Sequence, residues 1–153
     1  MIKRLLFGAA ALLCAAQAFA GEVTVSGAWV RATAPGQDSA AVSLNITSRQ
    51  EARIVGASSP VAQRVEIHTM QHENGMMMMR QADSLPLPAK HEVAIGAGDH
   101  LMLTGLKHAL KEGDSILLTL IIEFADKRKE EITVRAAVKP LTAGHKMQDM
   151  PGM

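Results

Sequence analysis

Two segments of the chain alternate between apolar and polar residues, and this period of two restricts the fold more than any other feature. The segments span residues 39–47 and 115–124. A period of two puts the apolar side chains on one face of a β-strand, whereas an amphipathic helix repeats every three to four residues. Shorter segments of the same kind occur at residues 22–26, 53–57, 64–68, 91–95, 100–104 and 131–138. Apart from one predicted helical turn at residues 107–111, the pattern indicates an all-β, antiparallel β-sandwich.

The first twenty residues have the pattern of a secretory signal peptide. Lys3 and Arg4 precede an apolar run over residues 5–16, and a small-x-small site ends at Ala20. We predict cleavage after Ala20 and a periplasmic protein. A membrane anchor is the alternative, but the run is shorter than the roughly 20 residues that a spanning helix needs.

A lipid-anchored form is disfavoured, because the bulky Leu13 stands immediately before Cys14. Cleavage after Ala20 removes Cys14, which is the only cysteine of the chain. The predicted mature chain therefore has neither a disulfide nor a thiolate, which excludes a blue-copper electron-transfer site and cysteine-based zinc sites. We expect one β-sandwich domain over residues 21–140 and a flexible tail over residues 141–153.

The charge of the predicted mature chain disfavours nucleic acid as a partner. The whole chain has 16 basic and 15 acidic residues, a formal charge of +1. Loss of two basic residues with the signal peptide leaves 14 against 15, or −1. Without a basic patch or a polybasic segment, we expect neither nucleic-acid binding nor membrane insertion of the mature chain.

Methionine and histidine concentrate between residues 68 and 102. Methionine is absent between Met1 and Met70, whereas six of the ten methionines and four of the six histidines fall in this stretch. Thioether sulfur is a soft, uncharged donor, and imidazole also binds copper well. We therefore hypothesise that this stretch binds Cu(I).

Strand alternation predicts which of these side chains share a face. Ile67 precedes His68, and Leu101 separates His100 from Met102. If the aliphatic side chains face the core, both histidines and Met102 point away from it. His100 and Met102 would then lie roughly 6.5 Å apart along one strand, close enough to bind one ion.

The four consecutive methionines follow a predicted hairpin turn. Glu-Asn-Gly at residues 73–75 favours a tight turn, because asparagine and glycine both tolerate a positive φ. In the strand that follows, Met77 and Met79 share one face, opposite Met76 and Met78. One pair could supply metal ligands while the other anchors the strand.

Structural explanations for these residues remain open. The methionines at 76–79 could fill gaps in a hydrophobic core, and His68 and His100 could be ordinary surface histidines. We interpret the other three histidines of the domain as surface residues, namely His72, His91 and His108. The joint occurrence of these features in a secreted chain without cysteine favours the metal site.

The C-terminal tail repeats the same chemistry. Its last nine residues contain one histidine and three methionines, which are His145, Met147, Met150 and Met153. We predict a flexible second copper arm there. The alternative is a solvated chain end with a chance excess of methionine, and exposed methionines of this kind are open to oxidation.

The chain resembles the periplasmic copper chaperones of the PCu(A)C type over nearly its whole predicted mature length. The matching segments are Ala28-Trp29-Val30-Arg31-Ala32, Pro35-Gly36, Gly56-Ala57-Ser58-Ser59-Pro60, Val65-Glu66-Ile67-His68, Glu73-Asn74-Gly75, Met77-Met78-Met79-Arg80, His100-Leu101-Met102-Leu103 and Leu110-Lys111-Glu112-Gly113-Asp114. The family signature is a histidine, a methionine eleven positions later, and then a His-x-Met. His68, Met79 and the pair His100 and Met102 match it, with one residue fewer before the second histidine than the family usually has.

The resemblance implies a cupredoxin-like, Greek-key β-sandwich that binds Cu(I) through His68, Met79, His100 and Met102. It also implies delivery of copper to the binuclear copper centre of a respiratory oxidase, outside the cytoplasmic membrane. Some members have a His/Met-rich tail, which implies capacity for a second copper, Cu(II) included.

We therefore hypothesise a monomeric metallochaperone that exchanges copper with an oxidase subunit or assembly factor. One alternative is copper storage or resistance, and another is a metal-free β-sandwich interaction module. An enzyme is the least favoured class, because the chain has no G-x-S-x-G motif, no tyrosine and no cysteine nucleophile after cleavage.

Overall fold

In the computed structural model, residues 21–142 are described, and they contain ten β-strands and no helix. The strands are β1 (Val23–Arg31), β2 (Ser39–Ser48), β3 (Ala52–Ser58), β4 (Ala62–Glu73), β5 (Met76–Ala82), β6 (Leu85–Leu87), β7 (Glu92–Ile95), β8 (His100–Leu106), β9 (Ser115–Phe124) and β10 (Lys129–Lys139). Within this range no helix could span a membrane. The predicted signal peptide and residues 143–153 of the predicted tail lie outside the described residues.

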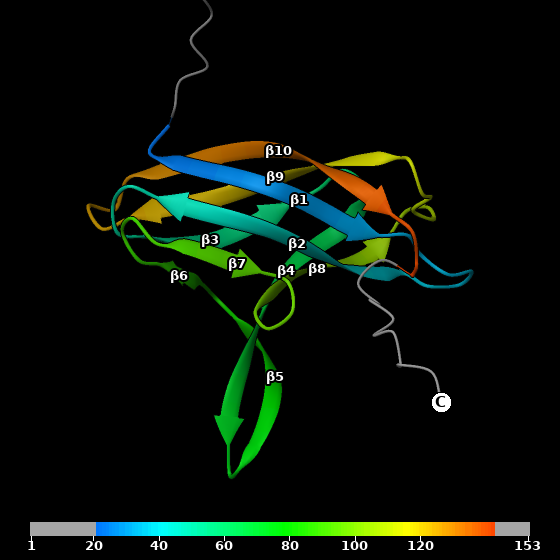
Figure 1. Ribbon diagram of the computed structural model, residues 1–153, viewed down its shortest axis with the longest axis horizontal. Coiled ribbons are helices and arrows are strands. Elements are labelled where there is room, and N and C mark those ends of the chain that lie inside the picture. The colour runs from blue at the N-terminus through cyan, green and yellow to red at the C-terminus, as the bar shows by residue number, and fades with distance from the viewer. Residues whose placement is uncertain (1–20, 143–153) are drawn as a thin grey trace, which may run out of the picture.

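The strands form one hydrogen-bonded sheet that folds over on itself into a sandwich (Figure 1). Its order is β5-β4-β8-β2-β1-β10-β9-β3-β6, and β7 also pairs with β2, in line with β8. The two ends of this order approach each other, because β3, the second strand from one end, contacts β4, the second strand from the other. Most neighbours in the sheet are distant in sequence, as Greek-key connections require. All pairings are antiparallel except that of β1 with β10, which is parallel.

The alternation seen in the sequence places the core as predicted. The apolar face of β2 is buried, as is that of β9; the residues concerned are Ala40, Val42, Leu44, Ile46, Ile116, Leu118, Leu120, Ile122 and Phe124. On β10 the predicted inward residues Ala136 and Val138 are buried, whereas Ile132 and Val134 pack at the margin of the core. Burial of these side chains provides the main driving force for closing the sandwich.

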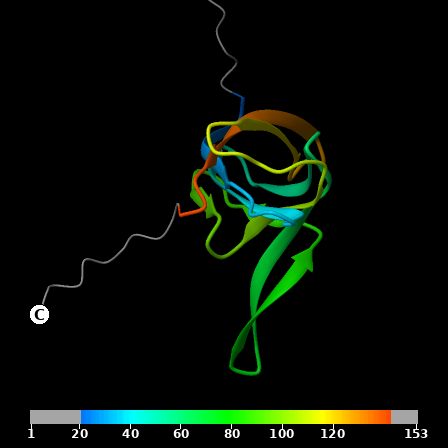
Figure 2. The same cartoon turned by 90° about the vertical axis from the view of Figure 1, so that its right-hand side faces the viewer.

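The β4–β5 hairpin extends beyond the body of the sandwich (Figures 1 and 2). β4 runs to Glu73, five residues past His68, and β5 pairs only with it. Asn74 and Gly75 join the strands with φ angles of 49° and 78°. The predicted two-residue turn is therefore confirmed, with both residues in the left-handed region that such a turn requires.

One local expectation differs from the structure. Residues 107–111 form a loop rather than a helical turn. The N–H of Leu110 donates to Thr33 Oγ1 (2.9 Å), and its carbonyl oxygen accepts from the N–H of Thr33 (3.0 Å). The backbone groups of Leu110 therefore bond to a segment distant in sequence and not within a helical turn. In addition, β6 forms around Pro86, which is tolerated because β6 is the last strand of the sheet and needs no N–H on that side.

Adjacent leucines on β9 provide a test of the core. Leu118 is fully buried, whereas the side chain of Leu117 points outward and is 42% exposed. We expect Leu118→Ala to lower the free energy of unfolding by about 2–5 kcal/mol, because it removes buried methyl groups and leaves a cavity. Urea denaturation followed by circular dichroism would measure this.

The matched control is Leu117→Ala, which we expect to change the free energy of unfolding by about 0.5 kcal/mol or less. Equal losses in the two variants would contradict the assigned orientation of β9.

Candidate metal site

The pairing of β4 with β8 brings two predicted ligands together. His68 lies directly opposite His100 in the antiparallel register, so both side chains are on the same face. Their rings meet edge to face, with centroids 5.2 Å apart and an interplanar angle of 68°. Ile67 directly precedes His68 and Leu101 directly follows His100, and both are buried in the core on the opposite face. The phase predicted from the sequence is therefore confirmed for both histidines.

Each imidazole has one nitrogen occupied by a protein acceptor. His100 Nδ1 lies 2.9 Å from the carbonyl oxygen of Gly98, and His68 Nε2 lies 3.0 Å from Glu66 Oε2. A carbonyl or carboxylate oxygen only accepts, so these two nitrogens carry the protons. The other nitrogen of each ring, Nε2 of His100 and Nδ1 of His68, is the one that can offer a lone pair to a metal. Contacts of this kind orient metal-binding histidines and fix their tautomers.

Met102 is the third predicted ligand on this face. It lies two residues beyond His100 on β8 and directly opposite Glu66. Its side chain is half-buried, whereas its neighbours Leu101 and Leu103 are fully buried in the core. His68, His100 and Met102 thus form one compact group of soft donors.

Met79 approaches the group from the other side. It is on β5, directly opposite Met70, and therefore diagonal to His68 on the same face of the sheet. One strand, β4, lies between β5 and the strand of His100, and the side chain of Met79 is 44% exposed. The four predicted ligands therefore share one face with the histidines at its centre, and closure around one ion requires the twisted hairpin to curl toward β8.

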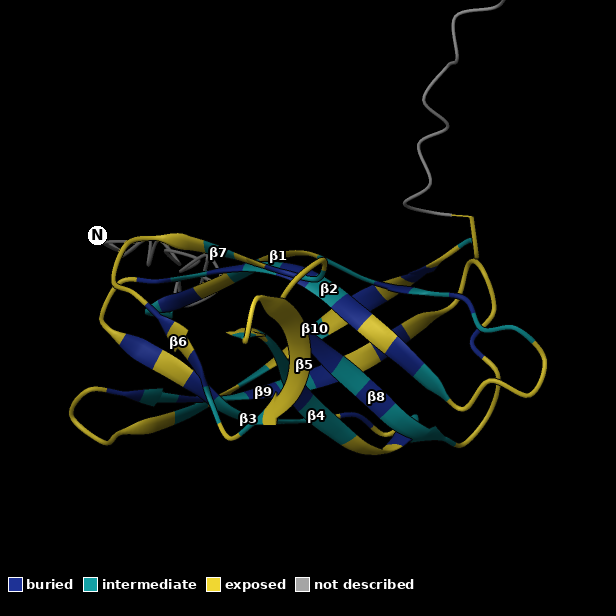
Figure 3. Ribbon diagram, turned by 90° about the horizontal axis from the view of Figure 1, so that it is seen from below, coloured by how far each residue is buried: buried dark blue, intermediate teal, exposed yellow. Residues whose placement is uncertain are grey.

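The exposure of these residues decides against two of the alternatives. His100 is only 7% exposed, so it is not a surface histidine, although it does point away from the main core. The loop at residues 96–99 lies beside it and supplies the Gly98 carbonyl. Met76, Met77, Met78 and Met79 are 63%, 59%, 38% and 44% exposed, so these methionines do not fill a core (Figure 3).

Two residues that we did not predict as site residues, Met70 and Asp99, join the hairpin to the loop before His100. Met70 lies between His68 and the turn and pairs with Met79. Its N–H donates to Asp99 Oδ1 (3.0 Å), which ties the base of the hairpin to the loop before His100. Strand alternation from His68 could have placed Met70 on the same face. The contact with Asp99 joins residues 29 positions apart, so no local sequence pattern predicts it.

The donors in the described part of the chain are soft. No cluster of three or more histidine, cysteine, aspartate or glutamate side chains suited to a metal occurs within residues 21–142. The predicted tail ligands His145, Met147, Met150 and Met153 lie outside the described residues, and the second copper arm stays a prediction.

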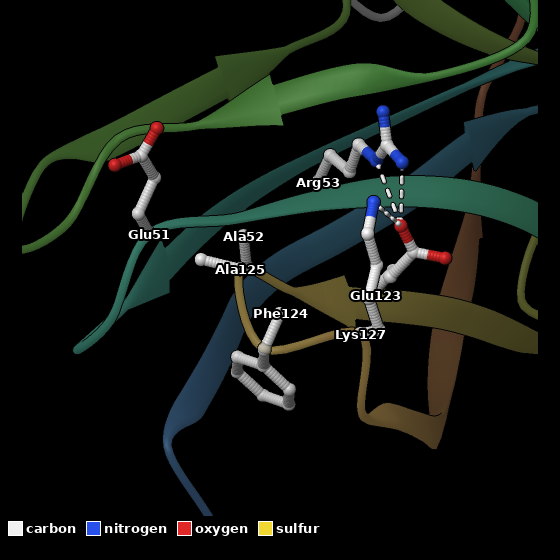
Figure 4. A pocket seen from close by; sticks show the side chains of 7 residues that line it. All are labelled: Glu51, Ala52, Arg53, Glu123, Phe124, Ala125 and Lys127. Atoms are coloured by element: carbon white, nitrogen blue, oxygen red, sulfur yellow. Dashed lines mark hydrogen bonds and ion pairs between the residues drawn. The ribbon is translucent and has the colours of Figure 1, made fainter.

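A small pocket of about 200 Å³ shares no residue with the His/Met group (Figure 4). Arg53 pairs with Glu123 in this pocket, and its hydrogen bond lowers the pKa of Glu123. Lys127 also approaches that carboxylate, at 3.8 Å. This pairing explains the charges of these three side chains without a ligand.

Comparison with known proteins places the chain in a family. The model of the LpqE-like family, described as "Putative lipoprotein LpqE-like", matches residues 23–138. "Putative lipoprotein Lxx21020" of Leifsonia xyli subsp. xyli is 35% identical over 115 residues, which cover 73% of this chain and 68% of that protein.

Similar solved structures are PCuAC domains and a copper-loaded protein. The "Copper-bound PCuAC domain from PmoF2" aligns with a TM-score of 0.64 at 23% identity, covering 78% of this chain and 94% of that domain. The solution structure of "CuI-DR1885" from Deinococcus radiodurans aligns with a TM-score of 0.59 at 35% identity, covering 81% and 83%. These similarities confirm the predicted cupredoxin-like β-sandwich and are consistent with the predicted PCu(A)C resemblance.

The hydrogen bond from His100 makes a prediction about its tautomer. In the metal-free protein we expect the neutral His100 ring to be the Nδ1–H tautomer, with Nε2 unprotonated, because Gly98 offers only an acceptor. Nitrogen-15 NMR of the imidazole rings would measure this. The exposed His91 is the internal control and should show a mixture of tautomers. A dominant Nε2–H form of His100 would contradict the geometry of the site.

Proposed function

The chain belongs to the LpqE-like family, and we propose that it is a periplasmic copper metallochaperone that binds Cu(I) through His68, Met79, His100 and Met102. One observation carries the proposal: the two paired histidines each keep a free nitrogen on the face that also holds the methionines. Imidazole and thioether together are a ligand set that suits Cu(I). The similarity to a Cu(I)-loaded protein at 35% identity supports the same metal.

The proposed mechanism is stepwise ligand exchange. His68 and His100 are held in place by hydrogen bonds, so they form the rigid part of the site. Met79 is on an exposed hairpin and can detach first, which opens a coordination position for a donor atom of the acceptor. Uncharged thioethers bind Cu(I) without the charge stabilisation of a thiolate, so the metal stays exchangeable.

We further propose that the acceptor is the binuclear copper centre of a respiratory oxidase, reached directly or through an assembly factor. The proposal follows from the PCu(A)C resemblance and from the predicted export. The predicted cleavage after Ala20, the monomeric state and a second copper at the tail belong to the same proposal. The family and relative names refer to lipoproteins, whereas the sequence around Cys14 favours a cleaved, unanchored chain.

A competition titration tests the primary site. Residues 21–153 would be titrated with Cu(I) against a chromophoric chelator under anaerobic conditions. We expect one tight site, and we expect His100→Ala to weaken it by at least about 100-fold, because loss of a direct ligand exceeds the usual 10- to 100-fold cost of losing an outer partner. Circular dichroism would verify that the variant folds.

Two controls complete this titration. His91→Ala should leave the affinity unchanged, since His91 is exposed and lies outside the His/Met group. Truncation after Thr142 should also retain the tight site. Tight binding that survives His100→Ala but disappears with the tail would sink the proposal and move the copper site to residues 145–153.

A transfer experiment separates delivery from storage. The Cu(I)-loaded protein would be mixed with an isolated oxidase domain that carries the empty binuclear site, and its absorption would be followed over time. We expect copper to appear in the acceptor, and faster from Met79→Ala than from the wild type, because the exposed ligand that must leave first is missing. Copper that stays bound in the presence of excess acceptor would indicate storage.

A further inference from the structure

We propose that one face of the β4–β5 hairpin is a second Cu(I) site, formed by Met70, His72 and Met77, and that Met79 connects it to the primary site. This inference rests on the proposed function and extends it with a capture site. It concerns residues outside the proposed primary site, including His72, which the sequence alone marks only as a surface histidine.

The strand register brings these donors together. His72 lies directly opposite Met77, and Met70 directly opposite Met79. Directly opposite residues have Cβ atoms roughly 5 Å apart, and successive residues on one face of a strand are about 6.8 Å apart. The four side chains therefore occupy the corners of a small rectangle on one face. A methionine side chain is long and flexible enough to reach an ion above its centre.

The hairpin face continues the primary site without a gap. His68 and Met70 are neighbours on the same face of β4, so the rows of donors run from Met102 and His100 outward to His72 and Met77. Exposure increases along this path. His100 is 7% exposed, Met79 is 44% exposed and Met77 is 59% exposed. Incoming metal meets the outer donors first.

The opposite face of the hairpin differs in chemistry and serves as its control. Met76 and Met78 are on that face, together with the ion pair of Arg80 with Glu73 (2.6 Å). It has two thioethers and no histidine, and the Arg80–Glu73 ion pair lies beside them. Only the first face combines three thioethers with an imidazole, the soft donor set that suits Cu(I).

Met79 belongs to both groups, so it can pass the ion from one to the other. A Cu(I) ion held by His72 and Met77 can bind Met79, release His72 and then reach His68. At each step one donor joins before another leaves, and the charge and oxidation state of the metal do not change. The hairpin thus supplies an associative route to the histidine pair, of which His100 is buried.

NMR of the methionine methyl groups tests the site. The protein from Gly21 to Met153, carbon-13 labelled at the methionine methyls, would be titrated with Cu(I) under anaerobic conditions. The first equivalent should shift the methyl signals of Met79 and Met102. The second equivalent should shift those of Met70 and Met77, alone or together with the tail methionines, and leave Met76 and Met78 unchanged.

The matched variants are the doubles His72→Ala with Met77→Ala and Met76→Ala with Met78→Ala. We expect the first double to weaken binding of the second equivalent at Met70 by at least about tenfold, and to slow uptake of the first equivalent without changing its final occupancy. The second double should change neither. All four positions are exposed on the hairpin, so both doubles preserve the core.

The outcomes separate this inference from the proposed function. If the first equivalent leaves Met79 and Met102 unshifted, the proposed function fails. If the first equivalent binds as expected but the second moves only the tail methionines, or moves Met76 and Met78 as much as Met77, the hairpin site is overturned. Equal uptake rates in the two doubles would overturn its role in capture.

Discussion

The pairing of β4 with β8 is the interaction on which the proposed site depends. It sets Ile67 and Leu101 in the core and His68 and His100 on the other face. A slip of one residue would turn the histidines into the core and expose the aliphatic side chains, so burial of the apolar face specifies the register. The free energy that folds the sandwich thus also positions the two histidines proposed as metal ligands. The hydrogen bonds of Gly98 and Glu66 then set the orientation of each ring.

The hairpin depends on the same framework but is held much less tightly. Past His68, β4 loses β8 as a neighbour and keeps only β5, because β8 begins at His100. Among the described residues, the hydrogen bond from the N–H of Met70 to Asp99 is the outermost side-chain contact between the hairpin and the body of the sandwich. A two-stranded ribbon with little buried surface is marginal by itself, so it can bend without disturbing the core. This gives the site a rigid half with two histidines and an adjustable half with thioethers.

Sequence periodicity predicted the features that depend on local order. The alternation of apolar and polar residues predicted both β2 and β9 and which face of each is buried. The Asn74-Gly75 pair predicted the hairpin turn. The pairing of His68 with His100 joins residues 32 positions apart, so only the family signature suggested it. Neither source indicated that the loop before His100 would bury that ring, or that Leu110 would bond to Thr33 instead of forming a helical turn. These features arise from contacts between distant segments, which propensity and spacing do not encode.

The exposed methionines of β5 promote association between protein molecules unless they bind a ligand. An edge strand with exposed apolar side chains favours association between molecules, and charged or polar residues usually protect such edges. Here Met77 and Met79 are 59% and 44% exposed on the edge strand of the sheet, directly opposite His72 and Met70. Stability of the fold does not require methionine at these positions, because they contribute nothing to the core. A soft metal ion accounts for the thioethers, for their common face with the histidines and for their exposure, whereas core packing accounts for none of the three.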